Sequence, residues 1–261
     1  MIPAPTRYAR ASDLEHALEL LAEPDAKAIA GGQSLIPVMK LRIARPSVVV
    51  DISRLALRGV EERGGAIHIG PLTTWAELAG YERAGLEAIA ECARGIGDVQ
   101  VRNLGTLGGS LVHADPASDM PAVLLALGAS VETRSPEGSR EISVGDLLLG
   151  PFMTSLGPQE LVTDVVIPLP AEGSASAYAS VEHPASGFAL AGAAALSGPS
   201  GEAVALTGVG AAPFLLEGEP SEAIQSSEIY GDRFAPEEYR RELALVVAAR
   251  ALKSARERRP V

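Results

Sequence analysis

The chain has 261 residues, 47% of them hydrophobic, so it can bury a substantial core in one large domain or in two to three small ones. Acidic residues outnumber basic residues by 33 to 22, which argues against nucleic acid as the main partner. The single cysteine, Cys92, excludes an internal disulfide and a four-cysteine iron–sulfur cluster, and the four histidines lack metal-ligand spacing. No metal site is therefore expected.

No apolar run is long enough to cross a bilayer, so no integral membrane segment is expected. Residues 1–8 lack the charged and apolar regions of a secretory signal. A cytoplasmic protein is the resulting expectation.

The first 55 or so residues predict a small β-α-β-β unit. Apolar residues repeat at helical spacing over residues 14–21, and Ser12 with Glu15 forms a possible capping box in front of them. A short strand is expected at residues 26–30. The continuous apolar run of residues 48–52 predicts a strand that is buried on both faces.

The next segment predicts a strand at residues 66–69 and two helices. Thr74 and Glu77 are placed to cap the first helix, and Gly95 ends the second. Residues 99–119 contain polar and glycine residues in a pattern that fits neither the helical nor the strand period.

A compact apolar helix is predicted at residues 120–127, with Asp119 as its N-cap. Beyond this helix, a turn at residues 135–138 joins two strands, residues 130–134 and 140–144, into a hairpin.

The rest of the chain predicts a strand at residues 161–167, then a meander of three strands and a final helix. The meander covers residues 176–181, 188–196 and 203–209, and the helix has one apolar face over residues 239–247. The predicted fold class is α+β.

Two loops rich in glycine resemble each other. The first, Ala30-Gly31-Gly32-Gln33-Ser34, follows a strand, and paired glycines permit a positive φ and a close approach of another group. Successive amides in such a turn form a concave anion site, to which Ser34 adds a hydroxyl. An ordinary tight turn is the alternative interpretation.

The second loop, Gly105 to Ser110, repeats this composition: Thr106 and Ser110 flank Gly108 and Gly109. Two such loops suggest one extended ligand with two phosphates between them. Neither loop matches an NTPase P-loop or a Rossmann fingerprint. Arg102, four residues before Thr106, either reaches a phosphate or braces the loop.

Other polar residues are assigned modest roles. Asp119 can cap its helix with one carboxylate oxygen and accept from sugar hydroxyls with the other. His113 is interpreted as structural and Cys92 as an inert core thiol. No catalytic residue is identified, which suits a protein whose cofactor performs the chemistry.

Two longer segments carry a family resemblance. Residues 30–42 (AGGQSLIPVMKLR) and residues 101–111 (VRNLGTLGGSL), continuing into 113–121 (HADPASDMP), resemble the flavin loops of the FAD-binding medium subunit of the molybdenum hydroxylases, the carbon monoxide and xanthine dehydrogenase family. The resemblance extends to Gly208-Val-Gly210 and Pro213 near the C-terminus.

The resemblance implies an α+β fold: a two-subdomain FAD-binding fold of the vanillyl-alcohol-oxidase type plus a C-terminal three-stranded sheet with helices. The implied domains are an FAD-binding subdomain 1 at residues 1–57, a subdomain 2 at residues 58–170 and a C-terminal α+β domain at residues 171–261. The implied cofactor-binding residues are Ala30, Gly31, Gly32, Gln33, Ser34, Leu35, Thr106, Gly108, Gly109, Ser110, Asp119 and Leu161. Asp119 matches an aspartate that binds the ribityl chain, and Leu161 matches an apolar residue beside the flavin ring.

The resemblance also implies partners. A large subunit with a molybdenum–pterin cofactor oxidises the substrate, and a small subunit with 2Fe-2S clusters passes the electrons to the FAD of this chain. A dimer of heterotrimers is implied. Gln33 replaces a histidine common in one branch of the family, and Leu190 replaces a lysine found in another. These departures leave NAD, a quinone and oxygen open as the final acceptor.

Two alternatives to this function remain open. A free-standing FAD-dependent reductase or oxidase of the same general fold needs its own acid or nucleophile beside the flavin, and the sequence identifies none. A non-catalytic scaffold subunit uses both glycine loops only as turns.

Overall fold

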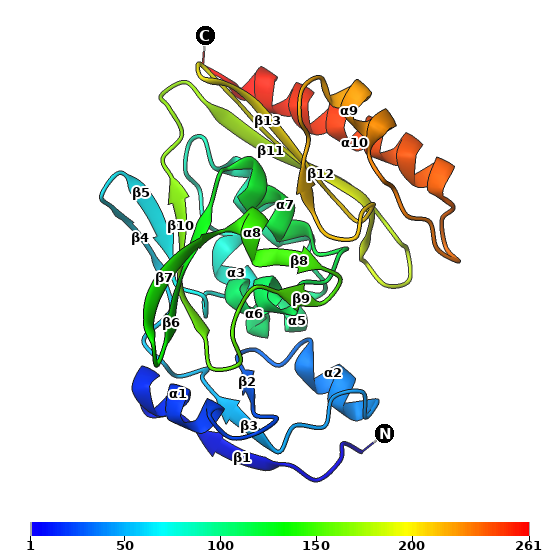
Figure 1. The fold of residues 1–261 in the computed structure, drawn as a ribbon. Coiled ribbons are helices and arrows are strands. Elements are labelled where there is room, and N and C mark those ends of the chain that lie inside the picture. The colour runs from blue at the N-terminus through cyan, green and yellow to red at the C-terminus, as the bar shows by residue number, and fades with distance from the viewer. Residues whose placement is uncertain (1, 261) are drawn as a thin grey trace.

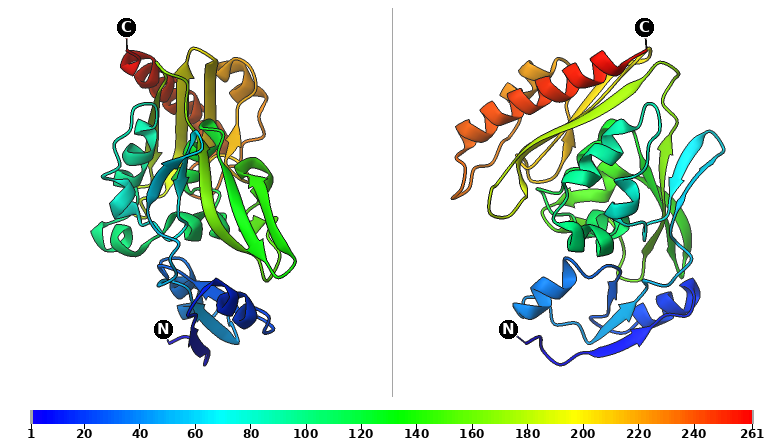
Figure 2. Two further views of the ribbon diagram at one scale, coloured as in Figure 1. Left: turned by 90° about the vertical axis from the view of Figure 1, so that its left-hand side faces the viewer. Right: turned by 180° about the vertical axis from the view of Figure 1, so that it is seen from behind.

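The structure, a computed structural model, describes residues 2–260. Three sheets follow one another along the chain, and the views in Figures 1 and 2 place the N-terminal and C-terminal sheets at opposite ends of the molecule with the second sheet between them. A two-stranded ribbon, β8 (Leu148–Gly150) with β9 (Met153–Thr154), lies beside the second sheet. The molecule mixes helices and strands throughout, as the predicted α+β class requires. No helix within residues 2–260 is long and apolar enough to span a membrane.

The first sheet is parallel, with the strand order β1-β3-β2. Its elements are β1 (Arg7–Arg10), α1 (Leu14–Leu21), β2 (Lys27–Ile29), α2 (Leu35–Lys40) and β3 (Val48–Asp51). All four residues of β3 are buried, as their continuous apolar run predicts. Strand β1 is a mostly exposed edge strand without a periodic apolar pattern. The observed order, β-α-β-α-β, differs from the predicted β-α-β-β unit by helix α2.

The predicted cap of α1 is wrong by one residue. Asp13 occupies the N-cap, and its carboxylate accepts a hydrogen bond from the His16 amide at 2.8 Å. Ser12 instead contacts the Asp13 carboxylate and the His16 ring through its hydroxyl. An aspartate and a serine cap helices almost equally well, so composition does not choose between adjacent candidates.

The second sheet has five antiparallel strands in the order β4-β5-β10-β6-β7. Its strands are β4 (Val60–Arg63), β5 (Ala66–Ile69), β6 (Ser130–Ser135), β7 (Gly138–Ser143) and β10 (Leu161–Pro168), and its helices are α3 (Trp75–Leu78), α4 (Glu87–Gly95), α5 (Val99–Leu104), α6 (Leu107–His113), α7 (Asp119–Ala126) and α8 (Val144–Leu147). The capping box of Thr74 and Glu77 at the start of α3 is confirmed. The β6–β7 hairpin is confirmed as well.

The segment without a clear period, residues 99–119, contains two short helices. Asp98 caps α5 by accepting from the Val101 amide, and Thr106 caps α6 by accepting from the Gly109 amide. The second glycine-rich loop is therefore mostly the first turn of α6. Two glycines in that turn lower its helix propensity, which hides the helix from a reading of the sequence.

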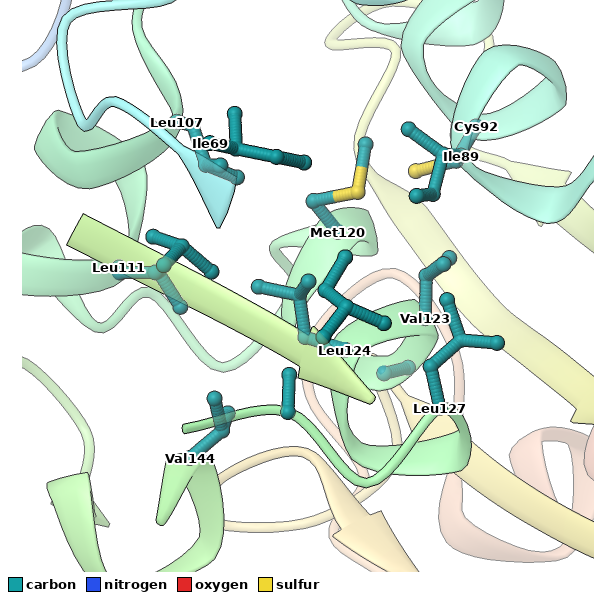
Figure 3. Close-up of a cluster of buried hydrophobic side chains, with 14 of the residues drawn as sticks. Ile69, Ile89, Cys92, Leu107, Leu111, Met120, Val123, Leu124, Leu127 and Val144 are labelled. Carbon is teal, nitrogen blue, oxygen red and sulfur yellow. The ribbon is translucent and has the colours of Figure 1, made fainter. Parts of the chain in front are cut away.

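Helix α7 is the centre of the largest apolar cluster (Figure 3). Met120, Val123 and Leu124 are at most 1% exposed and lie among residues of α4 and α6. The predicted cap of this helix is wrong: Ser118 holds the N-cap position without a side-chain hydrogen bond, and Asp119 is the first helical residue. The Asp119 carboxylate is therefore available for another partner.

The third sheet consists of β11 (Ala175–Glu182), β12 (Ala189–Gly198), β13 (Gly201–Thr207) and β14 (Phe214–Leu215) in that order. The three long strands form the predicted meander, and β14 adds two residues at one edge. Helices α9 (Pro220–Ser226) and α10 (Glu237–Arg258) follow. Alternate alanines of β12 belong to two different clusters, one shared with α10 and one shared with α7, so the strand is buried on both faces. Figure 1 shows the sheet between these two helices.

Candidate cofactor-binding site

The first glycine-rich loop connects β2 to α2 and carries unpaired amides. None of the five backbone amides of residues 31–35 donates to an acceptor within residues 2–260. The Ser34 hydroxyl lies at the N-cap position of α2 but makes no capping hydrogen bond. Unpaired donors in succession at the start of a helix favour an anion.

The two loops meet through their backbones. A Cβ on Gly31 would lie 1.7 Å from the Leu104 carbonyl oxygen and 3.1 Å from the Gly105 nitrogen. Only glycine permits so close an approach. Figure 1 shows the β2–α2 connection next to α5 and α6. The structure thus brings together the two segments that the sequence singles out.

The second loop has fewer free donors than the first. The amides of Leu107 and Gly108 donate to the carbonyl oxygens of Thr73 and Pro71, and the Gly109 amide donates to Thr106 Oγ1. The Thr106 amide has no acceptor within residues 2–260. Anion binding by backbone amides at this pair of loops therefore depends mainly on residues 31–35.

The paired glycines of the two loops have different physical roles. Gly32 alone among them has a positive φ, of 73°. A Cβ on Gly108 would lie 2.4 Å from Pro71 Cβ, so this glycine permits tight packing. Gly109 is exposed, and a Cβ there would crowd only Thr106 Oγ1, at 2.8 Å. The expectation that each glycine pair supplies a left-handed turn is corrected to Gly32.

Asp119 lies at the start of α7, partly buried. Its Oδ1 accepts a hydrogen bond from the Tyr178 hydroxyl on β11. Burial, which disfavours the charged carboxylate, raises the pKa of Asp119 to about 6 even though this hydrogen bond acts in the opposite direction. No other residue within residues 2–260 donates to Asp119 Oδ2, which remains an available acceptor.

The remaining predicted site residues have defined contacts. The Ser110 hydroxyl lies 2.6 Å from that of Ser118, and Gln33 Nε2 donates to the Gly31 carbonyl at 3.3 Å. Leu161 is 8% exposed and belongs to the apolar cluster of the first sheet. Arg102 donates to the Ile96 and Gly97 carbonyl oxygens, so it braces the chain before α5 and not, as the sequence had suggested, the second glycine-rich loop.

The residues that sequence reasoning missed are Ser118 and Tyr178. Ser118 is adjacent to Asp119, but the sequence around it does not predict a contact with Ser110. Tyr178 lies 59 positions from Asp119, and only the packing of the C-terminal sheet against α4 and α7 brings them together. The one available signal was a lone tyrosine among the alanines and serines of residues 175–180.

Within residues 2–260, one cluster of potential metal ligands lies on the second sheet. Ligand atoms of His68, Glu132 and Asp164 lie within 4.8 Å of one another. The Arg63 guanidinium donates to Asp164 Oδ2 at 2.9 Å, and His68 Nδ1 lies 2.7 Å from the same oxygen. The Asp164 carboxylate thus already has a cationic partner in Arg63, and Arg63, His68 and Asp164 form a hydrogen-bonded network.

Comparison with known proteins shows the family of this chain. Residues 4–170 match the profile of a family described as the FAD binding domain in molybdopterin dehydrogenase. The chain is 34% identical to the carbon monoxide dehydrogenase medium chain of Afipia carboxidovorans over 99% of both chains. It is 46% identical to the nicotine 6-hydroxylase medium subunit of Paenarthrobacter nicotinovorans, over 62% of this chain and 59% of that relative.

A solved structure shows the same fold. Carbon monoxide dehydrogenase from Hydrogenophaga pseudoflava, in a form that lacks the Mo-pyranopterin moiety, contains a chain that superimposes with a TM-score of 0.94 at 33% identity over the full length of both chains. The described fold, the family profile and the full-length relatives agree with one another. The chain therefore belongs to the family of FAD-binding domains of molybdopterin dehydrogenases, which includes the carbon monoxide dehydrogenase medium chains.

Proposed function

We propose that this chain is the FAD-binding subunit of a heterotrimeric molybdenum hydroxylase and relays electrons from the 2Fe-2S clusters of a partner, through FAD, to an external acceptor. Membership of the FAD-binding family supports the cofactor. The observation that carries the site is the run of five unpaired amides at residues 31–35, next to the Thr106 amide.

The residues present fit a diphosphate group. The amides of residues 31–35 and of Thr106 offer hydrogen bonds to phosphate oxygens, and the Ser34 hydroxyl is free to add one more. No lysine or arginine is needed for such a cradle, since oriented amides carry partial positive charge. Gly31 lets the backbones of the two loops touch, and Gly109 leaves the exposed part of the first turn of α6 without a side chain.

Asp119 fits the polyol portion of the cofactor. Its Oδ2 is an unused acceptor, and a ribityl hydroxyl is a donor of suitable chemistry. The proposed binding set is completed by the remaining predicted residues: Ala30, Gly32, Gln33, Leu35, Gly108, Ser110 and Leu161. The bound flavin supplies both one-electron and two-electron chemistry, which connects an iron–sulfur chain to a two-electron acceptor. The protein binds and orients that group.

Partner subunits are inferred from the relatives. Several relatives are named as medium chains or medium subunits, and one as a subunit of a dehydrogenase complex. We infer a large subunit with a molybdenum–pterin cofactor, a small subunit with 2Fe-2S clusters, and a dimer of heterotrimers.

Within this chain we propose subdomain 1 at residues 1–57, subdomain 2 at residues 58–170 and a C-terminal domain at residues 171–261.

The visible spectrum of the purified chain, before and after addition of FAD, tests cofactor binding. The expected result is one FAD per chain with the two absorption bands of a bound flavin. A colourless protein that takes up no added FAD would contradict the proposal and favour a scaffold role. Affinity purification from the native host tests the assembly: molybdenum and iron–sulfur chains are expected to co-purify, whereas a solitary flavoprotein would favour a free-standing reductase or oxidase.

A further inference from the structure

We infer that Tyr178, on the C-terminal sheet, is a positioning residue of the proposed FAD site, which holds Asp119 so that its second carboxylate oxygen stays free for a ligand hydroxyl. This inference rests on the proposed function. It assigns the C-terminal sheet a part in cofactor binding, although that sheet lies outside the matched family region, residues 4–170.

The Tyr178 hydroxyl lies where a glycine on the neighbouring strand leaves room for it. Gly192 on β12 is paired with Thr207 on β13. A Cβ on Gly192 would lie 2.4 Å from the Tyr178 hydroxyl oxygen and 2.8 Å from Thr207 Cγ2. Any side chain at position 192 would therefore displace the phenol or the threonine. A glycine in the interior of a strand weakens it, so this position has a reason other than sheet formation.

The same face of the sheet holds the chain just before Asp119. Thr207 Oγ1 lies 2.7 Å from the Ser118 carbonyl oxygen and 3.1 Å from the Pro116 carbonyl oxygen. The Gly208 amide also donates to the Pro116 carbonyl, at 3.0 Å. Together with Tyr178, these contacts fix both the backbone and the side chain of the segment that ends in Asp119.

The chemistry of the phenol suits this role. Burial and the neighbouring Asp119 charge raise the pKa of Tyr178 well above its usual value, so the hydroxyl stays protonated and acts as a donor to Oδ1. The donated hydrogen bond favours the charged form of Asp119, and a charged Oδ2 is a strong acceptor. The other titratable groups near this pair lie on α4, on β11 and before α7: Glu91, Cys92, Glu182 and Asp115.

A double-mutant cycle of Tyr178→Phe and Asp119→Asn tests the inference, with FAD affinity measured by quenching of flavin fluorescence between pH 5 and pH 8. Tyr178→Phe removes one hydroxyl, and its loss is expected to weaken FAD binding about tenfold at pH 7.5. A hydrogen bond to a charged group contributes about that factor to an equilibrium constant. In the Asp119→Asn background the same change should alter affinity less than twofold. Tyr81→Phe, which removes a half-buried hydroxyl without a hydrogen-bond partner within residues 2–260, is the matched control.

The pH profile separates positioning from a general structural effect. Wild-type affinity is expected to fall below about pH 6, as Asp119 becomes protonated, and the midpoint should move to higher pH in Tyr178→Phe because the carboxylate loses its donor. Additive losses in the double mutant, or an unchanged midpoint with tight binding in Tyr178→Phe, would overturn the inference while leaving FAD binding intact. A wild-type chain that binds no FAD would overturn the proposed function and this inference together.

Discussion

At the scale of single residues, Asp119 makes the FAD-free protein sensitive to pH. Its pKa is about 6 in the folded protein against an ordinary value of 3.8, so folding disfavours the charged form. The stability associated with this group is complete below about pH 3.8 and is lost as the pH rises through 6. A carboxylate retained at such a cost is typical of a functional position.

Asp119→Asn is expected to stabilise the FAD-free protein at pH 8 by roughly 2 to 3 kcal/mol, since the shift is about two pKa units. The difference from wild type should disappear near pH 4. Urea unfolding across this pH range measures it. Asp25→Asn is the control, because Asp25 is exposed and its left-handed conformation, φ 59°, suits asparagine equally well. Equal stabilisation at all pH values would show that the Asp119 charge is not the cause.

The glycines of the two loops should respond differently to alanine. Gly31→Ala places a Cβ against the Leu104 carbonyl and is expected to cost about 3 kcal/mol or more of folding free energy. Gly109→Ala meets only a hydroxyl and should change stability by less than about 1 kcal/mol, because alanine also favours the helix. It should nevertheless weaken FAD binding at least tenfold.

Thermal unfolding and flavin titration of the two variants distinguish these roles. Gly80→Ala is the control for Gly109→Ala. Gly80 is exposed, and a Cβ there would have the Glu77 carbonyl oxygen as its nearest neighbour, at 3.6 Å. Full FAD affinity in Gly109→Ala would exclude the first turn of α6 from the binding surface.

The sequence could indicate candidate site residues where a local pattern suggests a ligand. Gly32 and Ser34 follow a strand in a pattern that suggests an anion site, and the structure shows free donors there. The detailed physical reasons were not predictable. Whether Gly108 packs against Pro71 or faces a ligand depends on a neighbour 37 positions away.

At the scale of elements, a buried arginine links helix α10 to the C-terminal sheet by hydrogen bonds. Arg240 is 6% exposed and donates to the Leu190 and Gly208 carbonyl oxygens and, at 2.7 Å, to Asp232. The small side chains of α10 and β12 allow close packing, and Arg240 fixes the register of that packing. The Gly208 amide is in turn bonded to Pro116 in the segment before α7.

Arg240→Met should therefore destabilise the protein by roughly 3 kcal/mol, because it leaves two carbonyl groups and Asp232 Oδ2 without their donor. Chemical denaturation measures the change. Arg250→Met is the matched control on the same helix, since Arg250 is exposed and forms no salt bridge within residues 2–260. A loss below 1 kcal/mol would show that apolar packing alone holds α10.

Elements with strong periodicity were predictable, and those with mixed local preferences were not. The apolar runs of β3 and α7 and the hairpin of β6 and β7 lie close to their expected positions. Helix α6 was missed because two glycines oppose the helix that the Thr106 cap initiates. Strand β1, the first strand of the predicted β-α-β-β unit, could not be assigned residues because it is an exposed edge strand, held by its pairing with β3 across 41 positions. Helix α2 was missed altogether.

At the scale of the whole molecule, the proposed site draws on all three sheets. The first sheet leads into the loop of residues 31–35, the helices of the second contribute Thr106 and Asp119, and the third positions Asp119 through Tyr178. Such contacts join residues far apart in sequence, so the sequence alone could indicate the two loops but not the sheet that supports them.

The central claim is that the pyrophosphate of FAD binds between the two loops, and a structure of the chain with FAD bound tests it most directly. We expect phosphate oxygens within 3.2 Å of several amides of residues 31–35 and of the Thr106 amide, the usual range for such hydrogen bonds. A structure that places the diphosphate elsewhere, with these amides still unpaired, would contradict the account.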